Sequence, residues 1–129
     1  MIGTLQSVVL DCHYPAALAR FYAAVLGGEV DRPDPSVDED WSTLHTPDGQ
    51  LLAFQRVADF HPPQWPDPAH PQQFHLDIAV PDLDAAEREV VALGAAPLQR
   101  EDTFRVYTDP AGHPFCLVYE PATGGRTDG

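Results

Sequence analysis

The chain has 129 residues, which is the length of one ordinary domain with a real hydrophobic core. It carries 20 acidic and 7 basic residues, for a formal net charge of −13, and every basic residue is an arginine. So acidic a surface repels phosphate backbones and anionic lipid, and we expect neither a nucleic-acid nor a membrane partner. The lack of lysine excludes Schiff-base chemistry and a phosphate-loop lysine.

The cysteine content and the N-terminal pattern bear on where the protein works. Cys12 and Cys116 are too few for a disulfide framework and indicate reduced thiols. The first residues show no basic segment followed by an apolar stretch, and no apolar run approaches the length of a membrane span. We therefore expect a cytoplasmic protein.

The first half of the chain predicts one helix between strands. Apolar residues recur at helical spacing after Pro15, and Gly27 stops the pattern. Residues 29–40 hold six acidic residues and are interpreted as a solvated loop. The expected elements are a strand at 5–12, a helix at 15–26, and strands at 41–46 and 51–57.

A proline-rich connector separates this half from the next. Residues 61–72 contain five prolines and no apolar period, which is typical of an extended segment. The pattern then restarts, with Asp82 as the N-cap of a second helix. The expected elements are a strand at 74–80, a helix at 83–93, strands at 104–108 and 114–119, and a disordered tail at 122–129.

The two halves match each other in order and spacing. Placing Ser7 opposite His75 brings Gly27 opposite Gly94 within one residue. We interpret this as an internal duplication, in which each small sheet has one face that its own helix does not cover. Those two faces are predicted to line a trough for a small molecule. The expected organisation is one domain at 1–121, made of a module at 5–57, a connector at 58–72 and a module at 73–120.

Three stretches of the sequence resemble a known superfamily: Leu5–Tyr22, His75–Ala86 and Asp109–Phe115. This is the vicinal oxygen chelate superfamily, which includes glyoxalase I, bleomycin-resistance proteins and extradiol dioxygenases, and the chain is most similar to its glyoxalase-like domain branch. The resemblance covers about residues 5–120. It implies an α+β fold of two βαβββ modules, with a curved mixed sheet around a cleft. It also implies a homodimer, because members often pair modules between chains.

The same resemblance places four metal-ligand positions, one on the first and one on the last strand of each module: Ser7, Ala53, His75 and Cys116. Catalytic members have His or Gln at the first, His at the third and Glu at the other two, so this chain keeps only His75. Asp11 and Asp77 share the trough face but lie away from these positions. Since a catalytic ion needs about three protein ligands, we expect no metal and no cofactor.

Three residues on the second module are the strongest functional candidates. His75 is either a general base or hydrogen-bonding group in the cleft, or an inert former ligand. Asp77 is two residues away on the same strand face, and either orients His75 or is a solvated carboxylate. Cys116 is either a nucleophile beside His75 or a small apolar filler of the trough.

The remaining candidates would shape a ligand site. They are Ser7, Val9, Trp41, Gln55, Arg105 and Tyr107. Trp41 is interpreted as an aromatic wall of the trough or as core. Arg105 would anchor an anionic group, or alternatively form a structural ion pair with one of the many acidic residues.

Three hypotheses about function follow. The first is a protein that binds a small organic molecule in its cleft without a metal, as the drug-sequestering members of the superfamily do. The second is an enzyme, a lyase or isomerase, that uses His75 with substitute metal ligands or transfers a proton through His75 and Asp77 without metal. The third is an accessory domain whose cleft is filled by its own side chains.

Overall fold

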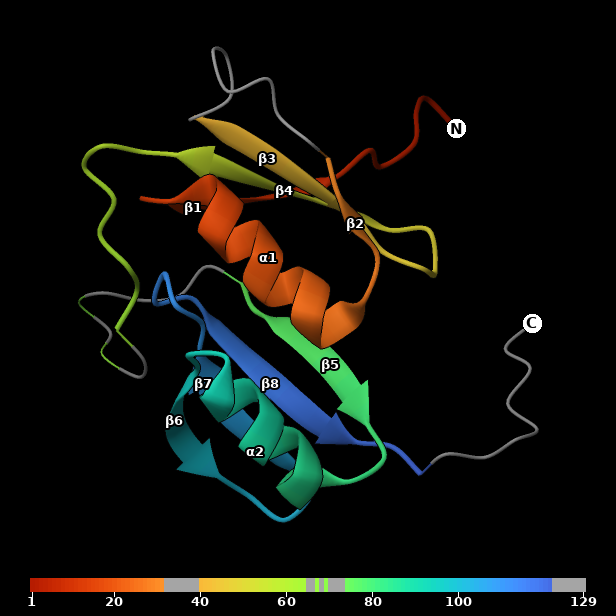
Figure 1. Cartoon of the computed structure of the whole chain (residues 1–129), viewed down its shortest axis with the longest axis vertical. Coiled ribbons are helices and arrows are strands. Elements are labelled where there is room, and N and C mark those ends of the chain that lie inside the picture. Colours follow the sequence, from red (N-terminus) through yellow and green to blue (C-terminus); the bar gives the residue numbers. More distant parts are fainter. Residues whose placement is uncertain (32–39, 65–66, 68, 70–73, 122–129) are drawn as a thin grey trace. The chain divides into compact units, whose positions relative to one another are not determined.

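The computed structural model describes residues 1–31, 40–64, 67, 69 and 74–121. The chain divides into two compact units, Met1–Pro62 (unit 1) and Pro63–Gly129 (unit 2). Among the described residues, each unit contains one four-stranded sheet and one helix (Figure 1). The predicted tail at 122–129 and residues 65–66, 68 and 70–72 of the predicted connector lie outside the described residues. No helix of the described part is long and apolar enough to cross a membrane.

Unit 1 is built from β1 (Val8–Cys12), α1 (Pro15–Leu26), β2 (Glu29–Val30), β3 (Trp41–His45) and β4 (Leu51–Arg56). The strand order is β1-β4-β3-β2, with β1 parallel to β4 and the other pairs antiparallel. The short strand β2 lies in a segment predicted to be loop, so that boundary was wrong. Two residues of a strongly acidic stretch carry too little alternation to predict a strand.

Helix α1 is held to its sheet by apolar packing. Its buried residues recur at helical spacing and include Leu18 and Tyr22, and the ring of Tyr22 stacks on Phe54 of β4 with centroids 5.9 Å apart. The helix ends before two glycines, as predicted. At Gly28 the backbone has φ +99°, and a Cβ there would collide with the carbonyl oxygen of His45. Only glycine therefore fits where the chain leaves α1 and passes close to β3.

Unit 2 is built from β5 (Leu76–Val80), α2 (Leu83–Ala92), β6 (Ala96–Arg100), β7 (Phe104–Thr108) and β8 (Pro114–Tyr119). Its strand order, β5-β8-β7-β6, repeats that of unit 1, and β5 is again parallel to β8. The prediction of two βαβββ modules is confirmed. The expected cleft between them stays a prediction.

The second module differs locally from the sequence-based expectation. Asp82 is the N-cap of α2, as predicted, and its Oδ1 accepts a hydrogen bond from the backbone N–H of Ala85 at 3.0 Å. Strand β6 was not predicted. All of its residues are exposed, it contains Pro97, and its pairing with β7 is irregular beside that proline. An exposed edge strand lacks the apolar alternation by which strands are recognised in a sequence.

Candidate functional site

Strand pairing determines which side chains share the helix-free face, the face of each sheet that is turned away from that unit's own helix. In unit 1, Phe54 packs on α1, so its neighbours along β4 point to the helix-free face. Ala53 is one of these, and it pairs with Val9 of β1. In unit 2 the equivalent pair is Asp77 of β5 and Cys116 of β8. The two modules therefore present equivalent positions with different chemistry.

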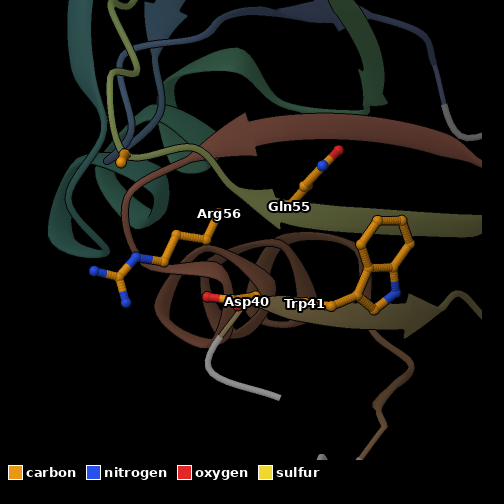
Figure 2. A pocket seen from close by; sticks show the side chains of 5 residues that line it. Asp40, Trp41, Gln55 and Arg56 are labelled. Carbon is orange, nitrogen blue, oxygen red and sulfur yellow. The ribbon is translucent and has the colours of Figure 1, made fainter. Parts of the chain in front are cut away.

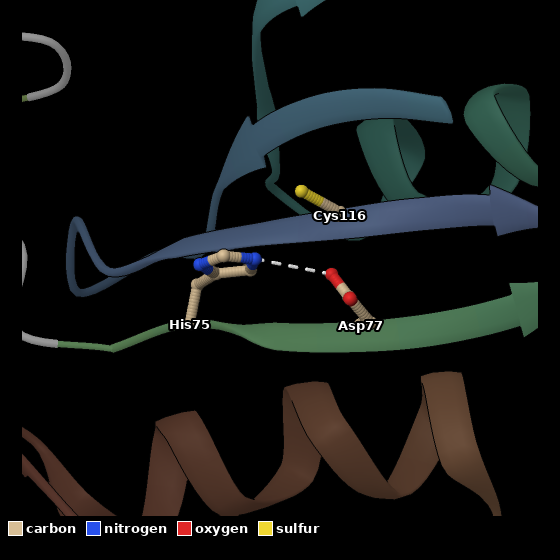
Figure 3. A group of neighbouring side chains, drawn as sticks. All are labelled: His75, Asp77 and Cys116. Carbon is tan, nitrogen blue, oxygen red and sulfur yellow. Dashed lines mark ion pairs between the residues drawn. The ribbon is translucent and has the colours of Figure 1, made fainter. Parts of the chain in front are cut away.

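In unit 2 three polar side chains converge on this face (Figure 3). His75 lies just before β5, Asp77 is two residues further along, and Cys116 stands beside Asp77 on the neighbouring strand. The Nε2 atom of His75 is 3.2 Å from Oδ1 of Asp77. The ligating atoms of all three residues lie within 4.8 Å of one another. The structure thus brings together both predicted catalytic residues and one predicted ligand-binding residue.

Burial differs sharply within this cluster and sets its chemistry. The side chains of His75 and Asp77 are 35% and 64% exposed, whereas Cys116 is buried. Burial, together with the neighbouring Asp77 carboxylate, raises the pKa of the Cys116 thiol to about 11. The metal-free thiol is therefore protonated at neutral pH, and it is not the thiolate that a cysteine nucleophile requires.

The cluster also has the composition of a metal site. An imidazole nitrogen, a carboxylate oxygen and a thiol sulfur are all donors that zinc accepts, at bond lengths of about 2.0–2.3 Å. Three donors with a separation of 3.2 Å between the nitrogen and the oxygen fit around one such ion. A bound ion of this class would polarise a substrate oxygen or lower the pKa of a bound water. The oxygen-rich, four-ligand set of the superfamily does not fit this chain, because Ala53 offers no donor.

Unit 1 contains a hollow of about 370 Å³ near the start of β3 and the end of β4 (Figure 2). It is lined by Asp40, Trp41, Gln55, Arg56 and Ala58. Trp41 and Gln55 pair directly across the two strands, and the indole is 40% exposed. Both were predicted as ligand-binding residues. Asp40 and Arg56 were missed. Asp40 comes just before β3 and Arg56 is the last residue of β4, so their position beside the hollow depends on the register of these two strands.

Two other predicted ligand-binding residues of unit 1 also lie on the helix-free face. Val9 is 38% exposed and Ser7 is half-buried. Val9 occupies the position equivalent to Asp77, and Ser7 the position equivalent to His75. Unit 1 therefore presents a mainly apolar surface where unit 2 presents its polar cluster.

Arg105 and Tyr107 take the opposite orientation from the one predicted. Arg105 Nη2 donates to Asp84 Oδ1 of α2 at 2.7 Å, and Tyr107 Oη donates to Glu87 Oε1 of α2 at 2.7 Å. Both side chains therefore lie on the helix-covered face, and the interpretation of Arg105 as a structural ion pair describes it correctly. The alternation along β7 correctly predicted that the two residues share one face of the strand. Because both side chains are polar, that face was predicted to line the cleft, and this prediction was wrong.

These contacts are reflected in the ionisation of the groups. The hydrogen bond and charge of Arg105 lower the pKa of Asp84, and the Asp84 carboxylate raises that of Arg105. Burial, followed by the hydrogen bond to Glu87, raises the pKa of the Tyr107 phenol. Arg105 and Tyr107, the two candidates for ligand contact on β7, therefore attach α2 to its sheet.

Comparisons with known proteins agree with this architecture. The profile of the glyoxalase-like domain family matches residues 7–118. A glyoxalase/bleomycin resistance/dioxygenase family enzyme from Burkholderia phytofirmans PsJN is 15% identical, with a TM-score of 0.68 over 91% of this chain and 98% of that one. The fosfomycin resistance protein FosX from Listeria monocytogenes is 13% identical, with a TM-score of 0.68 over 93% and 95%.

A glyoxalase/dioxygenase from Nostoc punctiforme is 21% identical, with a TM-score of 0.65 over 92% of each chain. No curated protein matches the chain. At these identities the solved structures establish the fold, and the family profile spans nearly the whole described chain. The chain therefore belongs to the glyoxalase-like domain family of the vicinal oxygen chelate superfamily.

Proposed function

We propose that this protein binds a small organic molecule on the helix-free face of unit 2, with the pair of His75 and Asp77 as its polar anchor. The observation that carries the proposal is a partly exposed imidazole, 3.2 Å from a carboxylate, on a sheet face that is otherwise largely apolar. Val106 of β7, which is buried, and Val118 of β8, which is half-buried, lie on that same face. A small number of converging polar groups on an apolar surface is the usual composition of a small-molecule site.

Sequestration is the simplest activity for such a surface. It requires shape, apolar contact and a polar anchor, and it does not depend on a metal or an activated water. One structure with this fold is a fosfomycin resistance protein, and we include a resistance role in the proposal. In unit 1 the hollow beside Trp41 and Gln55 supplies a second aromatic and hydrogen-bonding surface.

A thermal-shift screen of antibiotics and hydrophobic metabolites tests the proposal. A ligand present at a hundred times its Kd stabilises the folded protein by about 2.7 kcal/mol. We expect His75→Ala to abolish the shift produced by any compound found. His45→Ala is the matched control, because His45 also lies 3.2 Å from a carboxylate, that of Asp31, but in unit 1. A shift that survives His75→Ala and is lost in His45→Ala would contradict the proposal.

Catalysis is the second candidate, and one observation favours it. A carboxylate beside His75 Nε2 fixes the orientation of the ring and leaves Nδ1 as the nitrogen that exchanges a proton, as in a general base. A lyase or isomerase of this type would exchange a carbon-bound hydrogen of its ligand with solvent. Deuterium uptake by the bound compound in D₂O, lost in His75→Gln, would distinguish the enzyme from the binding protein.

Oligomeric state and location complete the proposal. We propose a homodimer, which light scattering of the purified protein measures directly, and a cytoplasmic location. Both rest on the superfamily resemblance and on the composition of the chain, with its two cysteines and acidic surface.

A further inference from the structure

We infer that unit 2 by itself holds a zinc-class metal ion through His75, Asp77 and Cys116, with Asp77 as the ligand that no superfamily position supplies. This goes beyond the proposed function, since binding of a metal does not depend on the organic ligand. It also revises the expectation of a metal-free site. That expectation set Asp77 aside because it lies two residues away from the superfamily position at His75.

The strand register explains why Asp77 becomes a third donor. Asp77 is paired with Cys116 across two parallel strands, and neighbouring strands are about 4.8 Å apart. His75 precedes Asp77 by two residues, so alternation directs both side chains to the same face. All three ligating atoms lie within 4.8 Å of one another (Figure 3). Two hydrogen-bonded strands therefore position the whole donor set.

The chemistry of the donors selects the class of ion. Magnesium and calcium prefer oxygen ligands, whereas a set of one thiolate, one imidazole and one carboxylate suits zinc and cobalt. Three protein donors leave a fourth tetrahedral position, and the partial exposure of His75 and Asp77 gives it access to solvent. On binding, the metal takes the place of the Cys116 thiol proton, which passes to solvent.

A second His–Asp pair in the chain shows what distinguishes this cluster. His45 Nε2 is also 3.2 Å from a carboxylate oxygen, that of Asp31, but the third group there is the hydroxyl of Thr43. In the described part of the chain, His75, Asp77 and Cys116 form the one group of three His, Cys, Asp or Glu residues with ligating atoms this close. The thiol of Cys116 is therefore the feature that distinguishes the cluster in unit 2, as a metal site, from the His45–Asp31 pair on the surface of unit 1.

Cobalt titration of the purified full-length protein tests the inference. We expect one equivalent of Co²⁺ to bind with a thiolate-to-cobalt charge-transfer band and the intense visible bands of tetrahedral cobalt. Zinc should displace it, and excess magnesium should not. Cys116→Ser should remove the charge-transfer band, while Cys12→Ser, which alters the other thiol of the chain, should leave it unchanged.

Asp77→Asn and His75→Gln test the other two donors. Outer-shell changes alone typically weaken metal affinity ten- to a hundredfold, so we expect a loss of at least about tenfold from each, against no change in His45→Gln. Circular dichroism identifies variants that have unfolded, and the result for each of the three ligand variants is interpreted separately from the other two.

The inference is overturned if the wild type takes up neither cobalt nor zinc, or if folded Cys116→Ser and Asp77→Asn bind cobalt as the wild type does. A thermal shift by an organic compound in the presence of chelator would then still support the proposed function.

Discussion

The two units repeat one topology but differ in what they present on the helix-free face. Val9 faces Ala53 in unit 1, where Asp77 faces Cys116 in unit 2, and both pairs join parallel strands in the same place in the strand order. The same backbone topology therefore occurs with and without a polar site, and a few side chains determine which of the two is present. In a duplicated fold one copy is free to lose donors while the other keeps or replaces them.

The helix-covered faces differ as well. In unit 1 the contact is aromatic, with Tyr22 of α1 stacked on Phe54. In unit 2, Val90 is the buried residue of α2, and the helix is fastened by carboxylates that receive hydrogen bonds from Arg105 and Tyr107. Equivalent helices are thus attached to equivalent sheets by different forces, one apolar and one charged.

Transplanting the cluster should have the largest effect on metal binding. Ser7→His, Val9→Asp and Ala53→Cys place the donors of unit 2 at the equivalent positions of unit 1. We expect the triple variant to bind a second equivalent of cobalt. Ala53 is buried, so the added sulfur costs about 1–3 kcal/mol of stability, which denaturation would measure. A folded triple variant that still binds one equivalent would show that donor identity alone does not make the site.

Removing the aromatic contact of unit 1 should have the largest effect on stability. Phe54 is fully buried, and Phe54→Ala is expected to lower the free energy of unfolding by about 3–5 kcal/mol, in chemical denaturation followed by circular dichroism. Trp41→Ala is the control, since it removes a larger ring from the partly exposed helix-free face of the same sheet. Equal losses from the two variants would contradict the assignment of the core to the helix-covered face.

The sequence predicted local features well and cross-strand features poorly. Helix α1, the cap at Asp82 and the shared face of His75 and Asp77 all follow from short-range spacing. The convergence of Asp77 with Cys116 depends on the register of two strands 39 positions apart (116 − 77), which no local pattern encodes. The alternation of the sequence also distinguished the two faces of β7. Which of these faces the helix covers depends on tertiary packing, and Arg105 was therefore assigned to the wrong face.

The helix N-termini offer a smaller contrast between the units. The Asp82 carboxylate caps α2, whereas Tyr14 at the same position of α1 makes no capping side-chain hydrogen bond in the described part of the chain. We expect Asp82→Ala to cost about 1 kcal/mol, measured by chemical denaturation. Tyr14→Ala should leave capping unchanged, so a comparable loss there would show that the difference measured at Asp82 is not due to the cap.

The smallest effect should come from the charged attachment of α2, and it should depend on pH. The pKa of Asp84 is lowered by Arg105, so the folded state favours the carboxylate more than the unfolded chain does. The ionised Asp84 therefore stabilises the folded state fully at a pH above the ordinary pKa of 3.8. This stabilisation is lost as the pH falls through the lowered pKa of the folded state. Asp84→Asn keeps a hydrogen-bond acceptor but removes the charge.

We therefore expect Asp84→Asn to be less stable than the wild type at neutral pH, with the difference shrinking below about pH 4. Asp84 is 67% exposed, so solvent screens the pair and the difference should be less than that at Asp82. Asp102→Asn removes one exposed charge from the same unit and is the control for net charge. If both variants change stability by the same amount at every pH, then α2 is held by its apolar contacts, as α1 is, and the contrast between the two helix-covered faces disappears.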